Sequence, residues 1–327
     1  MKGLSIIIPN YNGKHLFEKY FKNNLSIFQS LTIPFEIIVV DDASKDGSLA
    51  YLNENYPHQI QIIEKKINSG FSNTCNQGIN AAKYDLIFLL NTDVLLTPNY
   101  FDKLFKYFDD ENTFGVMGKI IGMNDDIIQD AARLPKLSGE KIKPTNFYYL
   151  EDENEKAPTL YLSGAIALVD AKKLKLLSGF NELFSPFYGE DAELCLRAWR
   201  MGWKCYYEHQ AICRHEISGS TKDYQKKYWI KTIYFRNRYF LHILHLNGIH
   251  LLLWHLQIIV SDVIPSILTF KTYKLKAYQQ IFTHLKALKI KKIAFEMLMK
   301  KQGVAFSIFD IINHIKTLLI GKKITRI

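Results

Sequence analysis

Three short polar clusters in the first hundred residues each follow directly on a run of apolar residues. They are Pro9–Asn12 after Leu4–Ile8, Asp41-Asp42 after Ile37–Val40, and Asn91–Asp93 after Leu86–Leu90. Carboxylates repel a phosphate group unless a hard divalent cation lies between them. If these clusters meet, their chemistry would therefore be the binding of a phosphate-containing ligand together with a metal ion.

The apolar runs are the elements that must position these clusters. Short Ile-, Val- and Leu-rich runs without alternation are typical of strands buried on both faces of a parallel sheet. Helical spacing over Leu16–Leu31 and over Ser72–Ala82 separates them. Strand and helix in alternation predict an α/β fold with a mostly parallel sheet flanked by helices. Ligands bind beyond the carboxyl ends of such strands, so we expect the three clusters to share one crevice.

The sequence excludes two familiar versions of this fold. No Gly-x-Gly-x-x-Gly follows a strand and no Gly-Lys-Ser/Thr occurs, which argues against dinucleotide-binding and P-loop proteins. A nucleotide crevice lined by carboxylates remains. A single Asp at a strand end is commonly a cap or turn residue, but three polar clusters in register favour a functional site.

The composition is that of a globular protein. The chain has 327 residues, 48% of them hydrophobic, enough for one large domain or two modest ones. Four cysteines without a Cys-x-x-Cys pair predict neither a disulfide framework nor a zinc finger, and they fit a reducing compartment. The first twelve residues do not have the pattern of a secretory signal.

The net charge of +10 is unevenly distributed. Residues 1–225 carry 24 basic and 29 acidic side chains, whereas residues 226–327 carry 18 and 3. The difference predicts two regions, of which the second, with a net charge of +15, would face a polyanion or an anionic membrane surface. We therefore place a domain boundary near residue 225.

Six motifs together resemble the inverting family 2 glycosyltransferases of GT-A fold. They are Ser5–Gly13, Val39–Gly47, Asn68–Phe71, Leu90–Asp93, Ser163–Ala165 and Gly189–Arg197. The resemblance covers about residues 1–220 and is closest to the rhamnosyltransferase-like branch of bacterial surface-polysaccharide enzymes. It implies transfer of a sugar from a UDP- or dTDP-linked donor to a hydroxyl of a glycan or polyprenol-linked acceptor.

The resemblance also assigns a donor-binding set. Tyr11 would stack on the nucleotide base, and Asp42 would accept the N–H of a uracil or thymine ring. Gly70 would let the backbone approach the diphosphate at a helix start. The full set is Pro9, Tyr11, Asp41, Asp42, Asn68, Gly70, Asn73, Asn91 and Thr92.

For the metal, the resemblance implies Asp93 as the ligand of Mg²⁺ or Mn²⁺ and His215 as a residue that closes over the diphosphate or the metal. The family motif is Asp-x-Asp, and this chain has Asn91 at the first position, so the site has one carboxylate fewer. A structural hydrogen bond is the alternative role of His215. Zinc binding by Cys205, His209, Cys213 and His215 fits no familiar spacing.

The base that accepts the proton of the acceptor hydroxyl would be Asp191, with Glu190 orienting the acceptor or the base. Adjacent carboxylates raise each other's pKa, which suits a base near neutral pH. Alternatively, these acids only start a helix, where the dipole favours them. We place Ser163, Gly164 and Trp199 on the acceptor side, with a helix-core position as the alternative for Trp199.

The last third of the chain predicts membrane contact. Residues 239–261 carry no charge but contain four histidines and the helix-breaking Asn247-Gly248. We expect two helices there, on the catalytic domain or in the membrane interface, with a single span as the alternative. Tyr278, Ile281, Phe282, Leu285 and Leu288 form an apolar stripe beside lysines, typical of a membrane-surface helix or of a helical cap.

The sequence as a whole predicts a peripheral enzyme on the cytoplasmic face of the membrane. No recognition motif indicates a nucleic-acid partner. A processive synthase would have a Gln-x-x-Arg-Trp motif, which this chain lacks. Two other functions remain open. A sugar nucleotidyltransferase would need a glycine-rich loop after the first strand, and a non-catalytic membrane or nucleic-acid adaptor would tolerate loss of Asp93 and Asp191.

Overall fold

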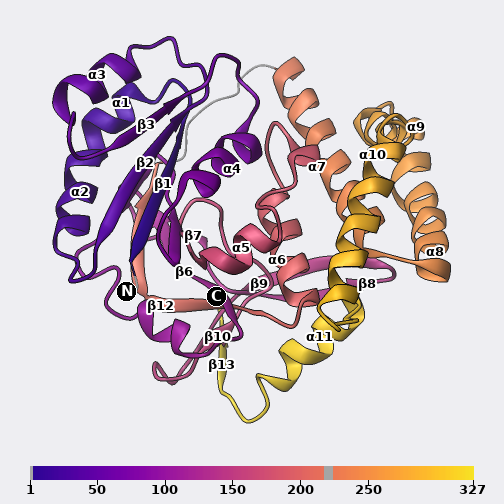
Figure 1. Ribbon diagram of the computed structural model, residues 1–327. Helices are drawn as coiled ribbons and strands as arrows, with labels where there is room; N and C mark the ends of the chain where they lie inside the picture. The colour runs from indigo at the N-terminus through magenta and orange to yellow at the C-terminus, as the bar shows by residue number, and fades with distance from the viewer. Residues whose placement is uncertain (1–2, 217–223) are drawn as a thin grey trace.

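A ten-stranded mixed sheet forms the centre of the molecule. The structure is a computed structural model that describes residues 3–216 and 224–327 (Figure 1). The sheet runs in the order β10-β12-β6-β11-β4-β1-β2-β3, with β5 paired to β12 and β7 paired to β6. Its strands are β1 (Leu4–Asn10), β2 (Phe35–Asp41), β3 (Gln61–Glu64), β4 (Leu86–Leu89), β5 (Val94–Leu96), β6 (Thr113–Gly122), β7 (Ile128–Asp130), β10 (Ala157–Pro158), β11 (Ala167–Asp170) and β12 (Lys204–His215).

The first four strands confirm the predicted parallel layer. β1 lies between β2 and β4 and is parallel to both, and β3 is parallel to β2. β11 is antiparallel to both of its neighbours, β4 and β6. The strands β1, β2 and β4 are almost wholly buried, which explains why their sequences are continuous apolar runs rather than alternating ones.

Short helices connect these strands. They are α1 (Lys14–Leu16), the π-helix η1 (Phe17–Phe21), α2 (Lys22–Gln29), α3 (Ser48–Asn55), α4 (Phe71–Ala81), the 3₁₀ helix η2 (Phe105–Asp109), α5 (Ala171–Leu176), the 3₁₀ helix η3 (Glu182–Phe184) and α6 (Glu190–Arg200). Both helices predicted from spacing are present. α4 packs so closely on the sheet that a Cβ at Gly78 would lie 2.5 Å from the side chain of Ile7. Glycine is therefore needed there for α4 to contact β1.

A second sheet joins the far end of the chain to its middle. It consists of β8 (Arg133–Ser138), β9 (Lys141–Leu150) and β13 (Ile324–Arg326), in the order β13-β9-β8. β8 and β9 form an antiparallel hairpin, and β13 pairs with the C-terminal end of β9.

The C-terminal region is helical, as predicted. It contains α7 (Tyr224–His245), α8 (Gly248–Ile258), the π-helix η4 (Ile259–Val263), α9 (Ile264–Leu268), α10 (Tyr273–Lys301) and α11 (Ile308–Thr317). Figure 1 shows α8 to α10 at one end of the molecule and β1 to β3 at the opposite end. Buried side chains of both regions, such as Phe88, Leu244 and Ile311, belong to one hydrophobic core.

The structure decides between the alternatives for the apolar segments of this region. The predicted break at Asn247-Gly248 separates α7 from α8, so residues 239–261 form two helices. The stripe predicted in α10 is divided. Ile281 and Leu288 are buried, and α10 packs on α7, whereas Phe282 and Leu285 are 63% and 39% exposed.

Candidate active site

A cavity of about 370 Å³ lies at the carboxyl ends of β1, β2 and β4. The three polar clusters converge there, as expected, together with residues of the segment that precedes α6. The lining residues are Pro9, Asn10, Tyr11, Asp42, Asn68, Gly70, Phe71, Thr74, Asn91, Thr92, Asp93, Pro186 and Phe187. We call this space the donor cavity.

Asp42 is the most tightly held polar residue of the donor cavity. Its Oδ1 accepts from Lys65 Nζ at 2.5 Å and from the backbone N–H of Ser69 at 2.9 Å, and its Oδ2 accepts from the N–H of Gly70 at 2.9 Å. The Lys65 ammonium is itself buried and also donates to Thr74 Oγ1. A carboxylate oxygen accepts about two hydrogen bonds, so Oδ2 retains room for one more donor. Sequence reasoning missed Lys65, because nothing local marks a lysine after β3 as the partner of an acid after β2.

Seven of the nine predicted donor-binding residues line this cavity. The other two, Asp41 and Asn73, do not belong to its lining. Asp41 is fully buried and accepts from Asn10 Nδ2 and from the N–H of Ser44, which supports the loop after β2. Asn73 donates to Glu182 Oε2 at 3.1 Å and thereby joins α4 to η3. Both have structural roles beside the cavity.

The candidate metal ligands lie close together at the edge of the donor cavity. His215 Nε2 lies 3.3 Å from Asp93 Oδ2, and the other ring nitrogen of His215 bonds to Gln129 Oε1 at 2.7 Å. If Nδ1 carries the proton for that bond, Nε2 presents its lone pair, as in a metal-ligating histidine. Gln129 is thus a positioning residue that the sequence did not reveal.

Two oxygens in this turn also indicate a missing ligand. Asp93 Oδ1 and Asn91 Oδ1 are buried and have no hydrogen-bond partner within the described residues. In the described part of the chain, no three or more His, Cys, Asp or Glu side chains are arranged to hold a metal. Cys205, His209, Cys213 and His215, the four residues considered for zinc, are thus not arranged as a metal site. An Asp, a His and an amide oxygen fit Mg²⁺ or Mn²⁺ whose other ligands come from phosphate and water.

A second cavity, of about 510 Å³, lies on the other side of the segment before α6. Pro186 and Phe187 of this segment line the donor cavity, whereas Gly189 and Asp191 line the second one. The remaining walls come from α6, α7, β7 and the β8–β9 hairpin. The full lining is Asp130, Lys136, Ile142, Lys143, Pro144, Leu160, Tyr161, Gly189, Asp191, Ala192, Leu196, Tyr234, Asn237, Arg238, Leu241 and His242. We call this space the second cavity.

Asp191 lies in the first turn of α6 and lines the second cavity. Its Oδ1 accepts from the N–H of Ala192 at 2.7 Å, and burial raises the pKa of its carboxyl above the usual value of 3.8. Gly164 lies beside it, where a Cβ would be 3.9 Å from Asp191 Cβ and 3.3 Å from the ring of Phe71. A carboxylate in such a place can act as a base toward a group in the second cavity.

Glu190 has a different environment from its neighbour Asp191. Its side chain is buried away from the residues that line the two cavities, and its Oε2 has no partner among the described residues. Burial, with a further contribution from the charge of Asp191, raises the pKa of Glu190 to about 8. Glu190 is therefore mostly protonated at neutral pH.

Asp130 and Tyr161 are site residues that the sequence did not predict. The Tyr161 hydroxyl donates to Asp130 Oδ1 at 2.8 Å, and both side chains line the second cavity. Burial raises the pKa of Asp130 to about 6, against the opposing effect of that hydrogen bond. Asp130 comes from the end of a three-residue strand that only the folded chain brings near α6, so no local pattern identifies it.

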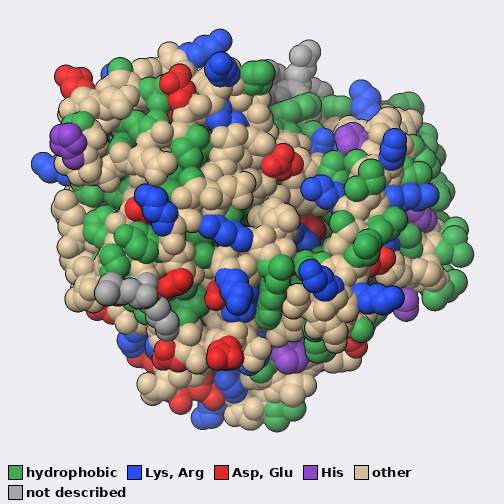
Figure 2. All heavy atoms as spheres, viewed as in Figure 1, with side chains coloured by type: hydrophobic (Ala, Val, Ile, Leu, Met, Phe, Trp, Pro, Cys, Tyr) green, Lys and Arg blue, Asp and Glu red, His purple; other side chains and the backbone are tan. Residues whose placement is uncertain are grey.

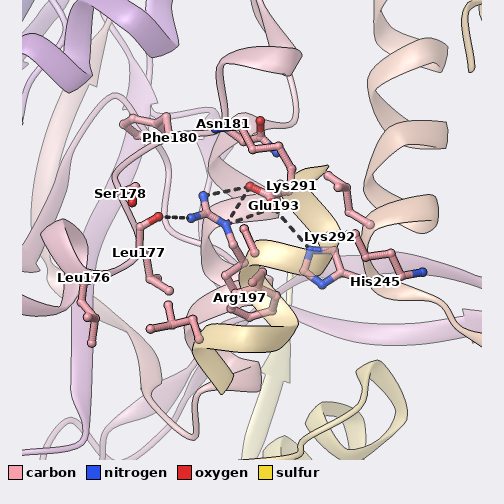
Figure 3. A pocket seen from close by; sticks show the side chains of 14 residues that line it. Leu176, Leu177, Ser178, Phe180, Asn181, Glu193, Arg197, His245, Lys291 and Lys292 are labelled. Atoms are coloured by element: carbon pink, nitrogen blue, oxygen red, sulfur yellow. Dashed lines mark hydrogen bonds and ion pairs between the residues drawn. The ribbon is translucent and has the colours of Figure 1, made fainter. Parts of the chain in front are cut away.

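A buried ionic network fixes α6 and with it Asp191 (Figure 3). Arg197 Nε donates to both carboxylate oxygens of Glu193, and its Nη atoms donate to the carbonyls of Leu177 and Gly179. Burial would raise the pKa of Glu193, but the charge of Arg197 holds it below its usual value. His245 of α7 lies 3.6 Å from Glu193, and burial lowers its pKa to about 4, so its ring is neutral. The network joins α6 to the turn after α5 and to α7.

The acceptor-side predictions are met only in part. Ser163 is buried and its N–H points to Met117 Sδ, while Gly164 lies next to Asp191 as described above. Trp199 is 2% exposed and its Nε1 donates to the carbonyl of Thr159. Its place is in the hydrophobic core behind α6, so the helix-core alternative holds for Trp199.

The fold is that of a GT-A glycosyltransferase. Among solved structures, the chain is similar to residues 1–349 of TarS from S. aureus in complex with UDP-GlcNAc (TM-score 0.56, 16% identity, covering 94% of this chain and 93% of that one). It is also similar to GalNAc-T7 with UDP, GalNAc and Mn²⁺ (TM-score 0.56, 14% identity, covering 74% and 47%). At these identities the similarity shows the fold alone.

The sequence matches define the family. The family model described as glycosyl transferase family 2 matches residues 5–177, and the chain belongs to that family. An uncharacterized glycosyltransferase, YfnE, of Bacillus subtilis (strain 168) is 29% identical over 224 residues, covering 65% of this chain and 53% of YfnE. Poly(ribitol-phosphate) beta-N-acetylglucosaminyltransferase TarP of Staphylococcus aureus (strain N315) is 27% identical over 121 residues, covering 36% and 37%. The chain spans about a third to a half of the length of the curated relatives that it matches.

Proposed function

We propose that the chain is an inverting glycosyltransferase that moves one sugar from a UDP- or dTDP-linked donor to a hydroxyl of a glycan or polyprenol-linked acceptor in cell-surface polysaccharide synthesis. The observation that carries the proposal is the position of Asp191, which lines the second cavity and lies across Gly164 from Phe71 of the donor cavity. A donor in one cavity and an acceptor in the other would meet at this carboxylate. Residues 1–225 would form the catalytic part and residues 226–327 its helical, membrane-associated part.

The transfer would proceed by a single displacement. Asp191 takes the proton of the acceptor hydroxyl, and the hydroxyl oxygen forms a bond to the anomeric carbon while the bond from that carbon to the diphosphate breaks. Attack from the side opposite the leaving group inverts the anomeric configuration. The raised pKa of Asp191 makes the carboxylate a better proton acceptor than an exposed aspartate.

The donor cavity offers a partner for each part of a nucleotide. The ring of Tyr11 is 57% exposed and can stack on the base, while Asp42 Oδ2 can accept the ring N–H of uracil or thymine. Asp93, with His215 and the amide oxygen of Asn91, would hold Mg²⁺ or Mn²⁺. A divalent cation there would neutralise charge that develops on the departing diphosphate.

Two findings on similar proteins support this reading. TarS and GalNAc-T7, which share the fold, were solved with UDP-GlcNAc and with UDP and Mn²⁺, respectively. The name of TarP describes transfer of N-acetylglucosamine to a poly(ribitol-phosphate) polymer.

The surface of α8, η4 and α9 supports a membrane-associated location. Among the described residues, one helical stretch, Gly248–Leu268, is long and apolar enough to cross a membrane, with a mean hydropathy of 1.7. Only 28% of its apolar window is buried within the protein. Apolar side chains gather along its outer edge (Figure 2). The exposed ones are Ile249, Leu252, Leu253, Leu256, Ile259, Val260, Ile264, Ile267, Leu268 and Phe270. This face, rather than the stripe of α10, would contact the lipid.

We propose that this stretch lies in the membrane interface rather than across the bilayer. Its inner face packs on the protein, where Asp262 forms ion pairs with Lys141 at 3.0 Å and with Lys274 at 2.9 Å, and Gln257 bonds to the β8–β9 turn. A helix that crossed the membrane would break these contacts and leave Asp262 in hydrocarbon. An in-plane helix keeps them and buries only the apolar face.

The donor site can be tested by thermal shift with UDP- and dTDP-sugars in the presence of Mn²⁺. We expect one of these donors to raise the melting temperature of the wild-type protein and to have no effect on Asp42→Asn, a variant that keeps the shape of the side chain. Asp102→Asn, on the exposed surface, is the matched control and should behave as wild type. If no donor stabilises the wild type more than Asp42→Asn, the donor-site assignment is wrong.

A further inference from the structure

The second cavity contains basic side chains that the proposed transfer does not use. Lys136, Lys143 and Arg238 line it at the end formed by the β8–β9 hairpin and α7, while Asp130 and Asp191 line it near α6. A neutral sugar acceptor would need the carboxylates but not the cations. We propose that this cavity is a subsite for an acceptor that carries a phosphate ester close to the hydroxyl that reacts. The inference rests on the proposed function for the role of Asp191.

The first observation is the register of the hairpin. Lys136 of β8 lies directly opposite Lys143 of β9 in the antiparallel pair. Directly opposed residues project from the same face of a sheet, with Cβ atoms about 4.5–5.5 Å apart, and like charges in such a pair are destabilising. Two opposed lysines that face a cavity are therefore suited to an anion that lies between their ammonium groups.

The second observation is the shortage of acidic partners for these cations. Within the described residues, neither Lys136, Lys143 nor Arg238 has a carboxylate within salt-bridge distance. Lys143 Nζ donates to Ser138 Oγ at 3.2 Å, and Arg238 Nη1 donates to the hydroxyl of Tyr234 at 3.1 Å. These neutral partners leave the positive charge of both groups uncompensated.

Other cations nearby are compensated, which makes the contrast informative. Lys141 and Lys274 share the carboxylate of Asp262 in a smaller adjoining cavity that Lys143 and Arg238 also line. The structure thus pairs Lys141 and Lys274 with a carboxylate and leaves Lys143 and Arg238, which line the second cavity, without one.

The walls that carry these cations are fixed by a neutral histidine. His242 Nε2 accepts from the backbone N–H of Ile142 at 3.1 Å, and its Nδ1 donates to the carbonyl of Arg238 at 2.6 Å. One imidazole therefore joins β9, which bears Lys143, to the turn of α7 that bears Arg238. The ring also stacks on Trp254 of α8, with centroids 5.5 Å apart. The backbone positions from which the two cationic side chains extend are therefore held together before any ligand binds.

A phosphate ester fits this arrangement better than other anions. A guanidinium and two ammonium groups provide the donors that surround the oxygens of a phosphate, and Arg does so in a bidentate manner. The carboxylates of Asp130 and Asp191 at the other end repel an anion, so the charged part of an acceptor would be directed to the hairpin. Its hydroxyl would then be left at Asp191.

The test is a lysine-acetylation footprint of the full-length protein with sn-glycerol 3-phosphate as the probe and glycerol as its uncharged counterpart. The extent of acetylation at each lysine is measured by mass spectrometry, without any sugar donor. We expect glycerol 3-phosphate to slow acetylation of Lys136 and Lys143 at least threefold and glycerol to have no effect. Lys172, an exposed lysine of α5 outside both cavities, is the internal control.

A second arm distinguishes a soluble phosphate ester from a lipid-linked one. Dihexanoyl phosphatidylglycerol, used below its critical micelle concentration, presents the same glycerol phosphate on a short lipid. Protection by glycerol 3-phosphate itself supports a phosphopolymer-like acceptor, whereas protection only by the lipid supports a lipid-linked one. Arg238→Gln should abolish protection of Lys143 in either case, while Lys172→Gln should not. Equal protection of Lys172, or protection by neither probe, overturns the inference.

The outcome is separable from that of the proposed function. The footprint needs neither donor nor turnover, so it reports the subsite alone. Donor-induced thermal stabilisation and its loss in Asp42→Asn report the donor cavity alone. If the footprint succeeds and no donor binds, the phosphate subsite stands and the glycosyltransferase proposal falls; the reverse result leaves a transferase whose acceptor is not recognised by phosphate.

Discussion

The donor cavity and the second cavity are adjacent but are built in different ways. The donor cavity is assembled from short loops after β1, β2 and β4, and among its described lining residues it has carboxylates but no lysine or arginine. The second cavity is lined by residues of two helices, a strand, a hairpin and the segment that contains Tyr161, and these include both cations and carboxylates. The difference indicates that one cavity serves a ligand neutralised by a metal ion and the other a ligand that brings its own negative charge.

The strongest way to test this comparison is to change the candidate base, Asp191, which lines the second cavity. We predict that Asp191→Asn lowers turnover about 10²- to 10⁴-fold, the usual contribution of a general base, with donor binding retained. Glu190→Gln should change turnover only a few-fold, because Glu190 is mostly protonated at neutral pH and glutamine has the same shape. The measurement is the rate of nucleotide release from the donor that binds.

The control for this pair is Asp102→Asn, which alters an exposed carboxylate outside both cavities. A larger loss in Glu190→Gln than in Asp191→Asn would reverse the assignment and place the base on Glu190. Full activity of both variants would exclude this pair as the base and would favour the adaptor alternative.

The second prediction concerns the donor cavity alone. Asp42→Ala leaves the buried ammonium of Lys65 without its counter-charge, and such an uncompensated charge costs about 3–5 kcal/mol of unfolding free energy. Lys65→Met together with Asp42→Ala should recover much of that loss, because no charge is then left buried. Chemical denaturation of the single and double variants tests this coupling. Equal stability of the single and double variants would show that the ion pair does not stabilise the loop.

The same two cavities mark the limit of what the sequence predicted. Short motifs that directly follow strands placed Tyr11, Asp42 and Asp93 in one cavity, because the parallel topology brings the strand ends together. Asn68 and Gly70 do not directly follow a strand, and only the family resemblance pointed to them. Asp41 and Asp42 are adjacent at a strand end, and only the fold shows that Asp42 lines the cavity while Asp41 bonds to the loop after β2.

The second cavity lacks any such local rule. Asp130, Lys143 and Arg238 come from three different elements, the last of them far along the chain from the other two, and only the tertiary fold brings them to one cavity. The apolar stripe of α10 was misleading for a related reason. Helical periodicity predicts that one face is apolar but not whether protein or lipid covers it, and here two of the five stripe residues are buried and two are exposed. A further exposed apolar face lies on α8 and α9, where residues that are apolar on nearly every side gave no amphipathic signal.

The third prediction distinguishes the two neighbouring acids by pH. In the folded chain the pKa of Glu190 is raised from 4.5 to about 8, so between those values the unfolded chain releases a proton that the folded chain keeps. The wild type therefore loses stability as the pH rises from about 4.5 to 8, whereas Glu190→Gln does not. Since one pKa unit corresponds to about 1.4 kcal/mol, the variant should gain a few kcal/mol on the wild type at pH 8.5 and little at pH 5.

This gain can be measured as the difference in melting temperature between Glu190→Gln and the wild type at the two pH values. Glu54→Gln, at an exposed position of α3, provides the control for replacing a glutamate and should show no such pH dependence. If the difference in melting temperature is the same at both pH values, Glu190 is ionised in the folded protein. In that case we would no longer expect Glu190→Gln to retain turnover.

The smallest predicted effect concerns the two opposed lysines of the second cavity. If Lys136 and Lys143 repel each other in the ligand-free hairpin, then Lys136→Gln should stabilise the protein by about 0.2–1 kcal/mol at low ionic strength, the range of cross-strand pairs. Salt screens this repulsion, so the gain should disappear in 1 M NaCl. Lys172→Gln has no opposed lysine and should show no gain. If Lys136→Gln is more stable than the wild type, the two lysine charges cost stability and their role is to bind the ligand. If Lys136→Gln is less stable, the charges instead stabilise the fold.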